Sequence, residues 1–186
     1  MDIVTADIGG THARFAVAAY EDGALRLGPV ATLKTAEYAS LPAAWEAFAG
    51  QAGRSLPRTA AIAVAAPVRG EALRLTNNPW VIHPAKLQAD LQLDAIHLLN
   101  DFGAITHALP WLARDDLPLL CGPGVPLPEE GTISVLGPGT GLGVGLLLRR
   151  AGRNIVVETE GGHVDFAPID DIDIGIMQRL QGRYQR

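Results

Sequence analysis

Short apolar runs, separated by turns rich in glycine, proline and asparagine, make up most of the chain. Residues 2–8 and 12–18 are two such runs, and Gly9-Gly10-Thr11 joins them. Alternating apolar positions predict strands, and a short glycine-rich connection predicts a hairpin. A turn at residues 21–23 precedes a further apolar run from Leu25 to Leu33, which predicts a third strand.

Apolar residues spaced three and four positions apart predict the helices. The first helix is expected after Ser40, a suitable N-cap, with Trp45 and Phe48 in the core. A short helix is expected to begin at Pro84. The helix predicted after Asp101 has an apolar face formed by Ala104, Ile105, Ala108 and Leu109. The last predicted helix, from Asp170 to Arg183, carries an apolar stripe of Ile172, Ile176 and Leu180.

Further apolar runs of strand length lie between these helices, at residues 59–65, 96–99, 132–136 and 144–148. Residues 68–75 predict a hairpin that turns at Arg69-Gly70, and the proline- and glycine-rich stretch 117–131 predicts a loop. Strands that alternate with helices are typical of the α/β class.

Composition narrows the class of protein. The 186 residues are 48% hydrophobic and 19% charged, which is typical of a globular chain of one domain or slightly more. A net charge of −5 offers no basic surface for nucleic acid or an anionic membrane. The single cysteine, Cys121, excludes an internal disulfide and multi-cysteine zinc motifs, and we expect it to be a small buried residue. Without a leader-like N-terminus or a membrane-length apolar run, a cytoplasmic protein is expected.

The Gly9-Gly10-Thr11 turn is a candidate phosphate-binding loop. Glycines let the backbone approach a phosphate closely, and Thr11 adds a hydroxyl donor. Asp7, just before the turn, is a candidate partner for Mg²⁺ through a bound water, because hard cations prefer carboxylate oxygen. An ordinary hairpin turn is the alternative, and the lysine of a P-loop is missing here.

Asn100-Asp101 follows the apolar run 96–99 directly and precedes a predicted helix. Open α/β sheets bind their ligands at the ends of strands. A carboxylate at this place can accept a proton from a substrate hydroxyl, and the neighbouring amide can bind another hydroxyl. The alternative is that Asp101 only caps the helix.

A second Gly-Thr hairpin is predicted in Gly137-Pro138-Gly139-Thr140-Gly141-Leu142-Gly143. Its glycine spacing differs from G-x-G-x-x-G, and a strand follows it, which disfavours a dinucleotide-dependent dehydrogenase. Structural glycines in a tight turn are the alternative. Two such hairpins at the starts of two similar β units nevertheless indicate a duplicated α/β architecture with a nucleotide between the halves.

Glu160 and His163 are candidates for binding hydroxyl groups, because both side chains can accept hydrogen bonds. Their spacing is similar to that of a helical metal motif. Gly161-Gly162 between them makes a helix improbable, however, and without further cysteines zinc is not expected. Asn77, beside Trp80, is a candidate for a sugar site, with turn chemistry as the alternative for the asparagine pair.

Five ordered segments together resemble the bacterial glucokinases, the group without the zinc motif of the ROK sugar kinases, within the hexokinase and actin-like ATPase superfamily. They are Asp7-Ile8-Gly9-Gly10-Thr11-His12-Ala13-Arg14, Thr76-Asn77-Asn78-Pro79-Trp80, Asn100-Asp101-Phe102, Gly137 to Gly143, and Glu160-Gly161-Gly162-His163-Val164-Asp165-Phe166. The family commonly has asparagine where His12 stands. The resemblance runs along essentially the whole chain.

The resemblance implies a kinase that transfers phosphate from ATP to the 6-hydroxyl of D-glucose, in glycolysis, with Asp101 as the general base. Asn77, Asn100, Glu160 and His163 would bind glucose. Asp7, Gly9, Gly10 and Thr11 would serve the terminal phosphates and Mg²⁺, and Gly139, Thr140 and Gly141 the phosphates from the other side. A homodimer is possible, and no zinc is implied.

The implied fold is a duplicated ribonuclease H-like α/β architecture. Residues 1–110 would form a small domain with the first phosphate loop and the catalytic aspartate. Residues 111–186 would begin a large domain that carries the second phosphate loop and the sugar-binding loop. The family's later motifs, a further sugar-contacting glutamate and a Gly-Gly motif near adenosine, have no counterpart in this chain. The alternative function is therefore a truncated sugar- or phosphate-binding fragment that is catalytically weak or inactive.

Overall fold

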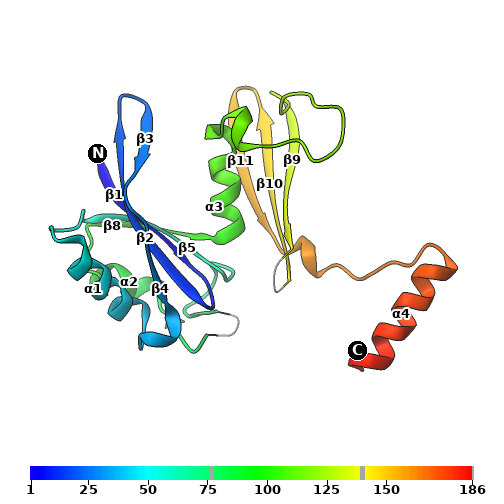
Figure 1. Cartoon of the computed structure of the whole chain (residues 1–186), viewed down its shortest axis with the longest axis horizontal. Coiled ribbons are helices and arrows are strands. Elements are labelled where there is room, and N and C mark those ends of the chain that lie inside the picture. The colour runs from blue at the N-terminus through cyan, green and yellow to red at the C-terminus, as the bar shows by residue number, and fades with distance from the viewer. Residues whose placement is uncertain (76–77, 139–140, 186) are drawn as a thin grey trace.

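The computed structural model describes residues 1–75, 78–138 and 141–185. Figure 1 shows the two larger β-sheets of the described chain with one helix, α3 (Asp101–Ala108), standing between them. The predictions for Asn77, Gly139 and Thr140 concern residues outside the described ranges. No helix within the described ranges is long and apolar enough to cross a membrane.

The first sheet has six strands, with the order β3-β2-β1-β5-β8 and with β4 paired to β2. Its strands are β1 (Asp2–Ile8), β2 (His12–Glu21), β3 (Ala24–Leu27), β4 (Ala31–Lys34), β5 (Thr59–Val64) and β8 (Ala95–Asn100). The pairs of β1 with β2 and of β2 with β3 are antiparallel, whereas β1 with β5 and β5 with β8 are parallel. This mixed sheet agrees with the predicted α/β class.

Helices α1 (Leu41–Ala52) and α2 (Pro84–Asp90) lie on one side of this sheet (Figure 1). Ser40 caps α1 as predicted, and its side chain accepts a hydrogen bond from the N–H of Ala43 at 3.3 Å. In the core, the ring of Phe15 stacks on Phe48 with centroids 5.2 Å apart and meets Trp45 edge-on at 6.1 Å. The predicted core positions of α1 are therefore confirmed.

The second sheet consists of β9 (Gly131–Pro138), β10 (Leu142–Arg150) and β11 (Arg153–Thr159), in the order β11-β10-β9. All its pairs are antiparallel, as they are in β3-β2-β1 of the first sheet. Each sheet thus begins with the same antiparallel meander, and a candidate phosphate loop connects the first two strands of each. This repetition supports the predicted duplication. Strand β11 has no counterpart among the predicted elements.

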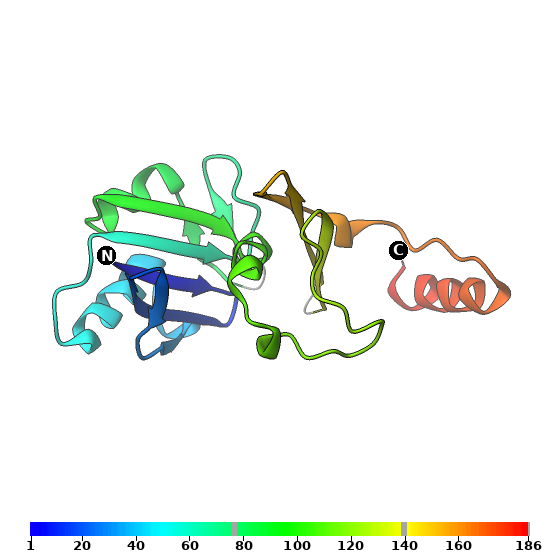
Figure 2. The same cartoon turned by 90° about the horizontal axis from the view of Figure 1, so that it is seen from above.

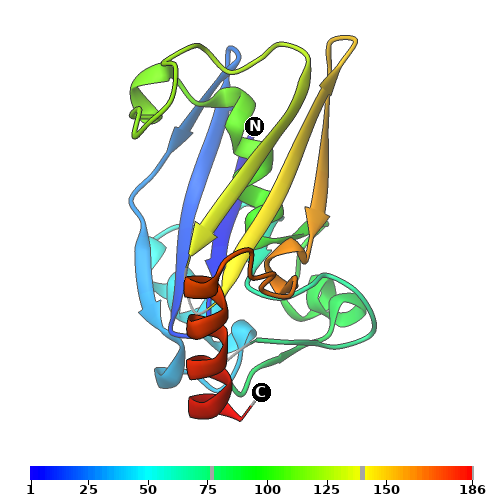
Figure 3. The ribbon, with the colours of Figure 1, turned by 90° about the vertical axis from the view of Figure 1, so that its right-hand side faces the viewer.

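Helix α4 (Asp171–Tyr184) stands apart from both sheets, at the end of an extended segment (Figure 2). The side chain of Asp170 caps it by accepting from the N–H of Asp173 at 2.8 Å. Every residue of α4 is exposed or half-buried, including its apolar stripe. Figure 3 looks onto the face of the second sheet that is turned away from α3. This face carries exposed Leu136, Ile155 and Val157.

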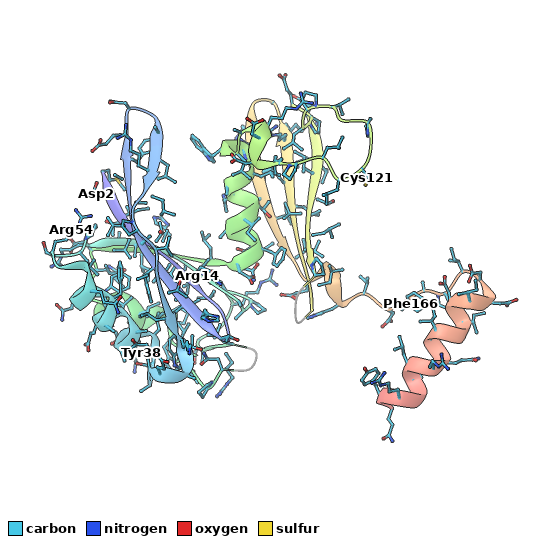
Figure 4. All side chains as sticks on the ribbon, in the orientation of Figure 1. Asp2, Arg14, Tyr38, Arg54, Cys121 and Phe166 are labelled. Atoms are coloured by element: carbon cyan, nitrogen blue, oxygen red, sulfur yellow. The ribbon has the colours of Figure 1, made fainter. Side chains whose placement is uncertain are left out.

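Several local predictions are wrong. The run from Leu25 to Leu33 forms two short strands, because Gly28 donates its N–H to Val17 and breaks the run. The predicted hairpin at 68–75 does not form, since β6 (Leu73–Arg74) pairs with β7 (Val81–Ile82). Cys121 is exposed on the long loop before β9 (Figure 4), where no core exists for it to fill.

The predicted apolar face of α3 is wrong in part: Leu109, just after the helix, is buried and Ala104 is half-buried, but Ala108 is exposed. Ile105 is 49% exposed, whereas Gly103 and Thr106 are the buried residues of the helix. The reason is that α3 meets the glycines of β9 and β10 through Phe102 and Thr106, and Gly103 lies against Glu158 of β11. The division expected at residue 110 stays a prediction, and α3 contacts β10 and β11 as well as β5 and β8.

Candidate active site

A cleft of about 700 Å³ lies between the two sheets, at the N-terminal end of α3. Five segments of the chain meet there, and most of them carry residues singled out in the sequence. The lining residues are Gly10, Thr11, Ala65, Ala66, Pro67, Asn100, Asp101, Phe102, Gly137, Gly141, Leu142, Gly143, Val144, Thr159, Glu160 and His163. The fold therefore brings the first loop, the strand-end carboxylate, the second hairpin and the Glu160–His163 segment to one place.

Asp101 is the half-buried carboxylate of this cleft. It follows the last residue of β8, and its Oδ1 accepts a hydrogen bond from the N–H of Phe102 at 2.9 Å. Burial is the largest influence on its pKa and raises it, since burial penalises the charged form. The N–H of Phe102 opposes that effect, and the negative charge of Asp7 raises the pKa further. A carboxyl group with a raised pKa is better matched to accepting a proton near neutral pH.

This environment predicts an elevated titration midpoint for Asp101. We expect its carboxyl group, followed by carbon-detected NMR, to titrate with a pKa above the ordinary value of an aspartate. Because burial is the main cause, Asp7→Asn should lower the midpoint but leave most of the elevation in place. An Asp101 that titrates like an exposed aspartate would contradict the environment described here.

Asn100, rather than Asp101, is the N-cap of α3. Its Oδ1 accepts from the N–H groups of Phe102 and Gly103 at 2.9 and 3.1 Å, and its Nδ2 donates to the carbonyl of Ala66 at 3.3 Å. The alternative that Asp101 exists only to cap the helix is thereby weakened. Asn100 fixes the corner between β8 and α3, and the second hydrogen of its Nδ2 is what it can offer to a substrate hydroxyl.

The first loop closes by a hydrogen bond from the N–H of Gly9 to the carbonyl of His12 at 2.9 Å. Gly10 and Thr11 line the cleft, whereas Asp7 and Gly9 are not among the lining residues found in the described chain. Asp7 forms an ion pair with Arg14 at 2.8 Å, with both side chains about half exposed. Figure 4 labels Arg14 on the first sheet. An accessible carboxylate beside the loop fits the hydrated Mg²⁺ of a nucleotide, which would then share Asp7 with Arg14.

The glycines of the second hairpin accommodate an aromatic ring. A Cβ atom at Gly143 would overlap ring carbons of Phe102, and one at Gly137 would lie 2.8 Å from Cε1 of the same ring. A Cβ atom at Gly145 would collide with the hydroxyl of Thr106. Packing of α3 therefore explains why Gly137, Gly143 and Gly145 are glycines. For Gly137 and Gly143 this favours a structural role, the alternative to phosphate binding. Gly141 differs, since a Cβ atom there would meet nothing within 4 Å.

Glu160 and His163 lie next to each other, with His163 Nδ1 3.6 Å from Glu160 Oε2. A single 3-10 turn, Gly161–His163, holds them, and the N–H of His163 donates to the carbonyl of Glu160 at 2.9 Å. Both side chains are largely exposed and line the cleft, where they can accept hydroxyl hydrogens. Among the described residues, no group of three metal-ligating side chains gathers around them.

Glu158 does not line the cleft but contacts its Asn100 corner, and the sequence did not indicate this contact. It extends from β11 in the second sheet, and its Oε1 accepts from the N–H of Asn100 at 3.2 Å, in the first sheet. Gly103 makes this contact possible, because a Cβ atom there would collide with the carboxylate of Glu158. Only the pairing of distant segments reveals it, so no local sequence signal could have indicated this role.

Comparison with known proteins identifies the family. The sequence profile described as glucokinase matches residues 4–186. A glucokinase of Zymomonas mobilis is 55% identical over 187 residues and covers the whole chain, and one of Ralstonia nicotianae is 40% identical over 195 residues and covers 99% of it. The chain spans only 58% and 56% of the lengths of these two relatives.

Solved structures agree with the profile. The crystal structure of a glucokinase from an Antarctic psychrotroph matches all of this chain with a TM-score of 0.82 and 29% identity, over 58% of its own length. A glucokinase from Balamuthia mandrillaris in complex with glucose matches 97% of this chain with a TM-score of 0.73 and 27% identity, over 54% of its own length. These matches confirm the predicted fold class, and the chain belongs to the glucokinase family.

Proposed function

We propose that this chain carries the catalytic aspartate, one phosphate loop and the sugar-binding segment of an enzyme that phosphorylates D-glucose at the 6-hydroxyl with ATP. The observation that carries the proposal is the position of Asp101, a half-buried carboxylate with a raised pKa in the same cleft as Gly10-Thr11 and Glu160–His163. One site thus combines hydrogen-bond donors for phosphate, a carboxylate that can accept a proton, and side chains that can accept hydrogen bonds from sugar hydroxyls.

In the proposed reaction, Asp101 accepts the proton of the 6-hydroxyl as that oxygen bonds to the γ-phosphorus of ATP and the bond to the bridging oxygen of ADP breaks. Phosphoryl transfer depends mainly on positioning and on charge stabilisation. Asn100, Glu160 and His163 orient the sugar, while Gly10 and Thr11 hold the terminal phosphates. Mg²⁺, when bound with the nucleotide near Asp7, supplies charge neutralisation. Approach of the two sheets would exclude water, the competing acceptor.

A second function, binding with little or no turnover, has its own support. The second sheet leaves Leu136 62% exposed and Ile155 47% exposed, and α4 covers neither sheet. A cleft with unsupported walls holds its substrates loosely, and positioning contributes about 7–11 kcal/mol to the lowering of a barrier. We therefore expect the 186-residue chain alone to bind glucose weakly and to turn over far below a typical kcat of about 10 s⁻¹.

The two functions are separated by comparing the chain alone with the same chain extended by the C-terminal remainder of the Zymomonas mobilis relative. Glucose binding is measured by calorimetry, and glucose 6-phosphate is measured by coupled NADP reduction with Mg-ATP present. Turnover in the extended protein and binding without turnover in the short chain would support both proposals. If neither protein bound or phosphorylated glucose, the proposed function would be wrong.

The metal requirement of the proposed site is also testable. Mg²⁺ is expected to be needed only together with nucleotide, and elemental analysis of the isolated protein should find no stoichiometric zinc. One zinc per chain would contradict the assignment of Glu160 and His163 to hydroxyl binding. A homodimer and the cytoplasmic location likewise stay predictions.

A further inference from the structure

We propose that Thr35, assisted by Asn78, is a positioning residue that turns the N–H groups of the first loop toward the phosphates of the nucleotide. The hydroxyl of Thr35 donates to the carbonyl of Gly10 at 2.8 Å, and its own N–H donates to the carbonyl of Thr11 at 3.0 Å. Asn78 Nδ2 donates to the same Gly10 carbonyl at 3.2 Å. The proposal rests on the proposed function, which assigns phosphates to this loop.

Planarity of the peptide bond links these contacts to the phosphate side of the loop. In a trans peptide the C=O and the following N–H point in opposite directions. Because Thr35 and Asn78 hold the Gly10 carbonyl, the N–H of Thr11 must point away from both of them. The Thr11 carbonyl is held in the same way and sets the direction of the N–H of His12. Gly10 and Thr11 line the cleft, so the orientation of this peptide decides what the cleft offers to an anion.

Both positioning side chains are themselves firmly placed. Thr35 is only 3% exposed and directly follows β4, whose Lys34 is in register with His12 of β2. Asn78 Oδ1 accepts from the N–H of Trp80 at 2.7 Å, and the buried Trp80 donates its ring N–H to the carbonyl of Tyr38 at 2.9 Å. Two segments distant in sequence from the loop therefore determine its conformation. A loop fixed before it binds its ligand loses less conformational entropy on binding.

Conservative variants separate this role from simple packing. Thr35→Val keeps the shape of the side chain but removes the hydroxyl donor, whereas Thr35→Ser keeps the donor and removes a methyl group. Asn78→Asp keeps the acceptor for Trp80 but removes the donor to Gly10. If positioning is the role, Thr35→Val and Asn78→Asp should impair the loop, and Thr35→Ser should restore it.

The test uses the 186-residue chain, with Mg-ATP and Mg-tripolyphosphate as phosphate probes and glucose as a separate ligand, all titrated by calorimetry. Thr35→Val is expected to weaken binding of both phosphate probes about tenfold, equivalent to about 1.4 kcal/mol, with glucose affinity unchanged. Thr35→Ser should bind within about twofold of the wild type. Amide hydrogen exchange at residues 9–12 should accelerate in Thr35→Val and not in Thr35→Ser, with exchange in β1 and β5 unchanged.

The outcomes distinguish the two proposals. Equal phosphate binding and equal loop exchange in Thr35→Val and wild type would overturn the positioning role and leave the proposed function intact. A wild-type chain that binds glucose but neither phosphate probe would overturn the assignment of phosphates to this loop, and the positioning role with it. Parallel loss of glucose and phosphate binding in Thr35→Val, unrescued by serine, would show a general structural role and contradict the proposal.

Discussion

Asp101→Asn is expected to lower kcat for glucose phosphorylation by about 10² to 10⁴, the usual contribution of a general base. The amide has nearly the same shape as the carboxylate and can still accept the hydrogen bond from Phe102, but it cannot accept the proton of the 6-hydroxyl. Glucose affinity should therefore change only modestly. The measurement is steady-state kinetics on the protein form that turns over, together with calorimetric glucose binding.

The chain offers a matched control at the other end of β8. Asp94 precedes the first residue of β8, as Asp101 follows its last, and it forms an exposed ion pair with Arg58 at 2.7 Å. Asp94→Asn removes a carboxylate of the same type away from the cleft, and exposed ion pairs contribute little to stability. It should leave kcat unchanged. Near-normal kcat in Asp101→Asn would show that Asp101 is a structural residue of the corner.

Asp101→Asn should also change the stability of the folded protein, and the sign of this change follows from the pKa of Asp101. The pKa of Asp101 is raised in the folded state, so the folded protein holds this proton more tightly than the unfolded chain does. Stability associated with the group is present below the unfolded pKa and is lost as the pH rises through the folded pKa. Asp101→Asn avoids this loss. Its melting temperature should match the wild type at low pH and equal or exceed it at neutral pH.

Two candidate segments of the site, Gly9-Gly10-Thr11 and Asn100-Asp101, could be located from the sequence because each follows a local rule. A strand that ends in Asn100-Asp101 and a glycine turn between two apolar runs are visible without any tertiary contact, and both are present in the structure. Burial of Trp45 and Phe48 was predictable for the same reason. The spacing of apolar residues is a clear signal where one face of a helix or strand packs against one core.

What sequence did not predict depends on contacts between distant segments. The buried face of α3 was missed because Thr106 and Gly103 pack on β10 and β11, which follow more than thirty residues later, and helical periodicity marks only large apolar residues. Glu158 and Thr35 were missed because their partners are backbone atoms far along the chain. The sequence shows the glycines of the second hairpin, but it does not show that they pack against the ring of Phe102.

Gly143→Ala is expected to damage both stability and catalysis, because the ring of Phe102 occupies the space into which the new methyl group would extend. Overfilling a packed site costs about 1–3 kcal/mol, which corresponds to a melting temperature lower by roughly 2–12 °C for a chain of this length. Phe102 is the next residue after Asp101, so displacement of its ring moves the proposed base, and kcat/KM should fall at least about tenfold. Thermal unfolding and steady-state kinetics measure the two effects.

Two further variants test whether contact with the Phe102 ring causes these effects of Gly143→Ala. Gly141→Ala lies in the same hairpin, where a Cβ atom meets nothing within 4 Å, so its melting temperature should stay close to that of the wild type. Phe102→Leu removes the ring, and in the double variant the added methyl group should cost less than it does alone, because contacting residues give non-additive effects. Strict additivity of Gly143→Ala and Phe102→Leu, or a Gly143→Ala protein as stable and active as the wild type, would contradict packing of α3 on the second sheet as the contact that places Asp101.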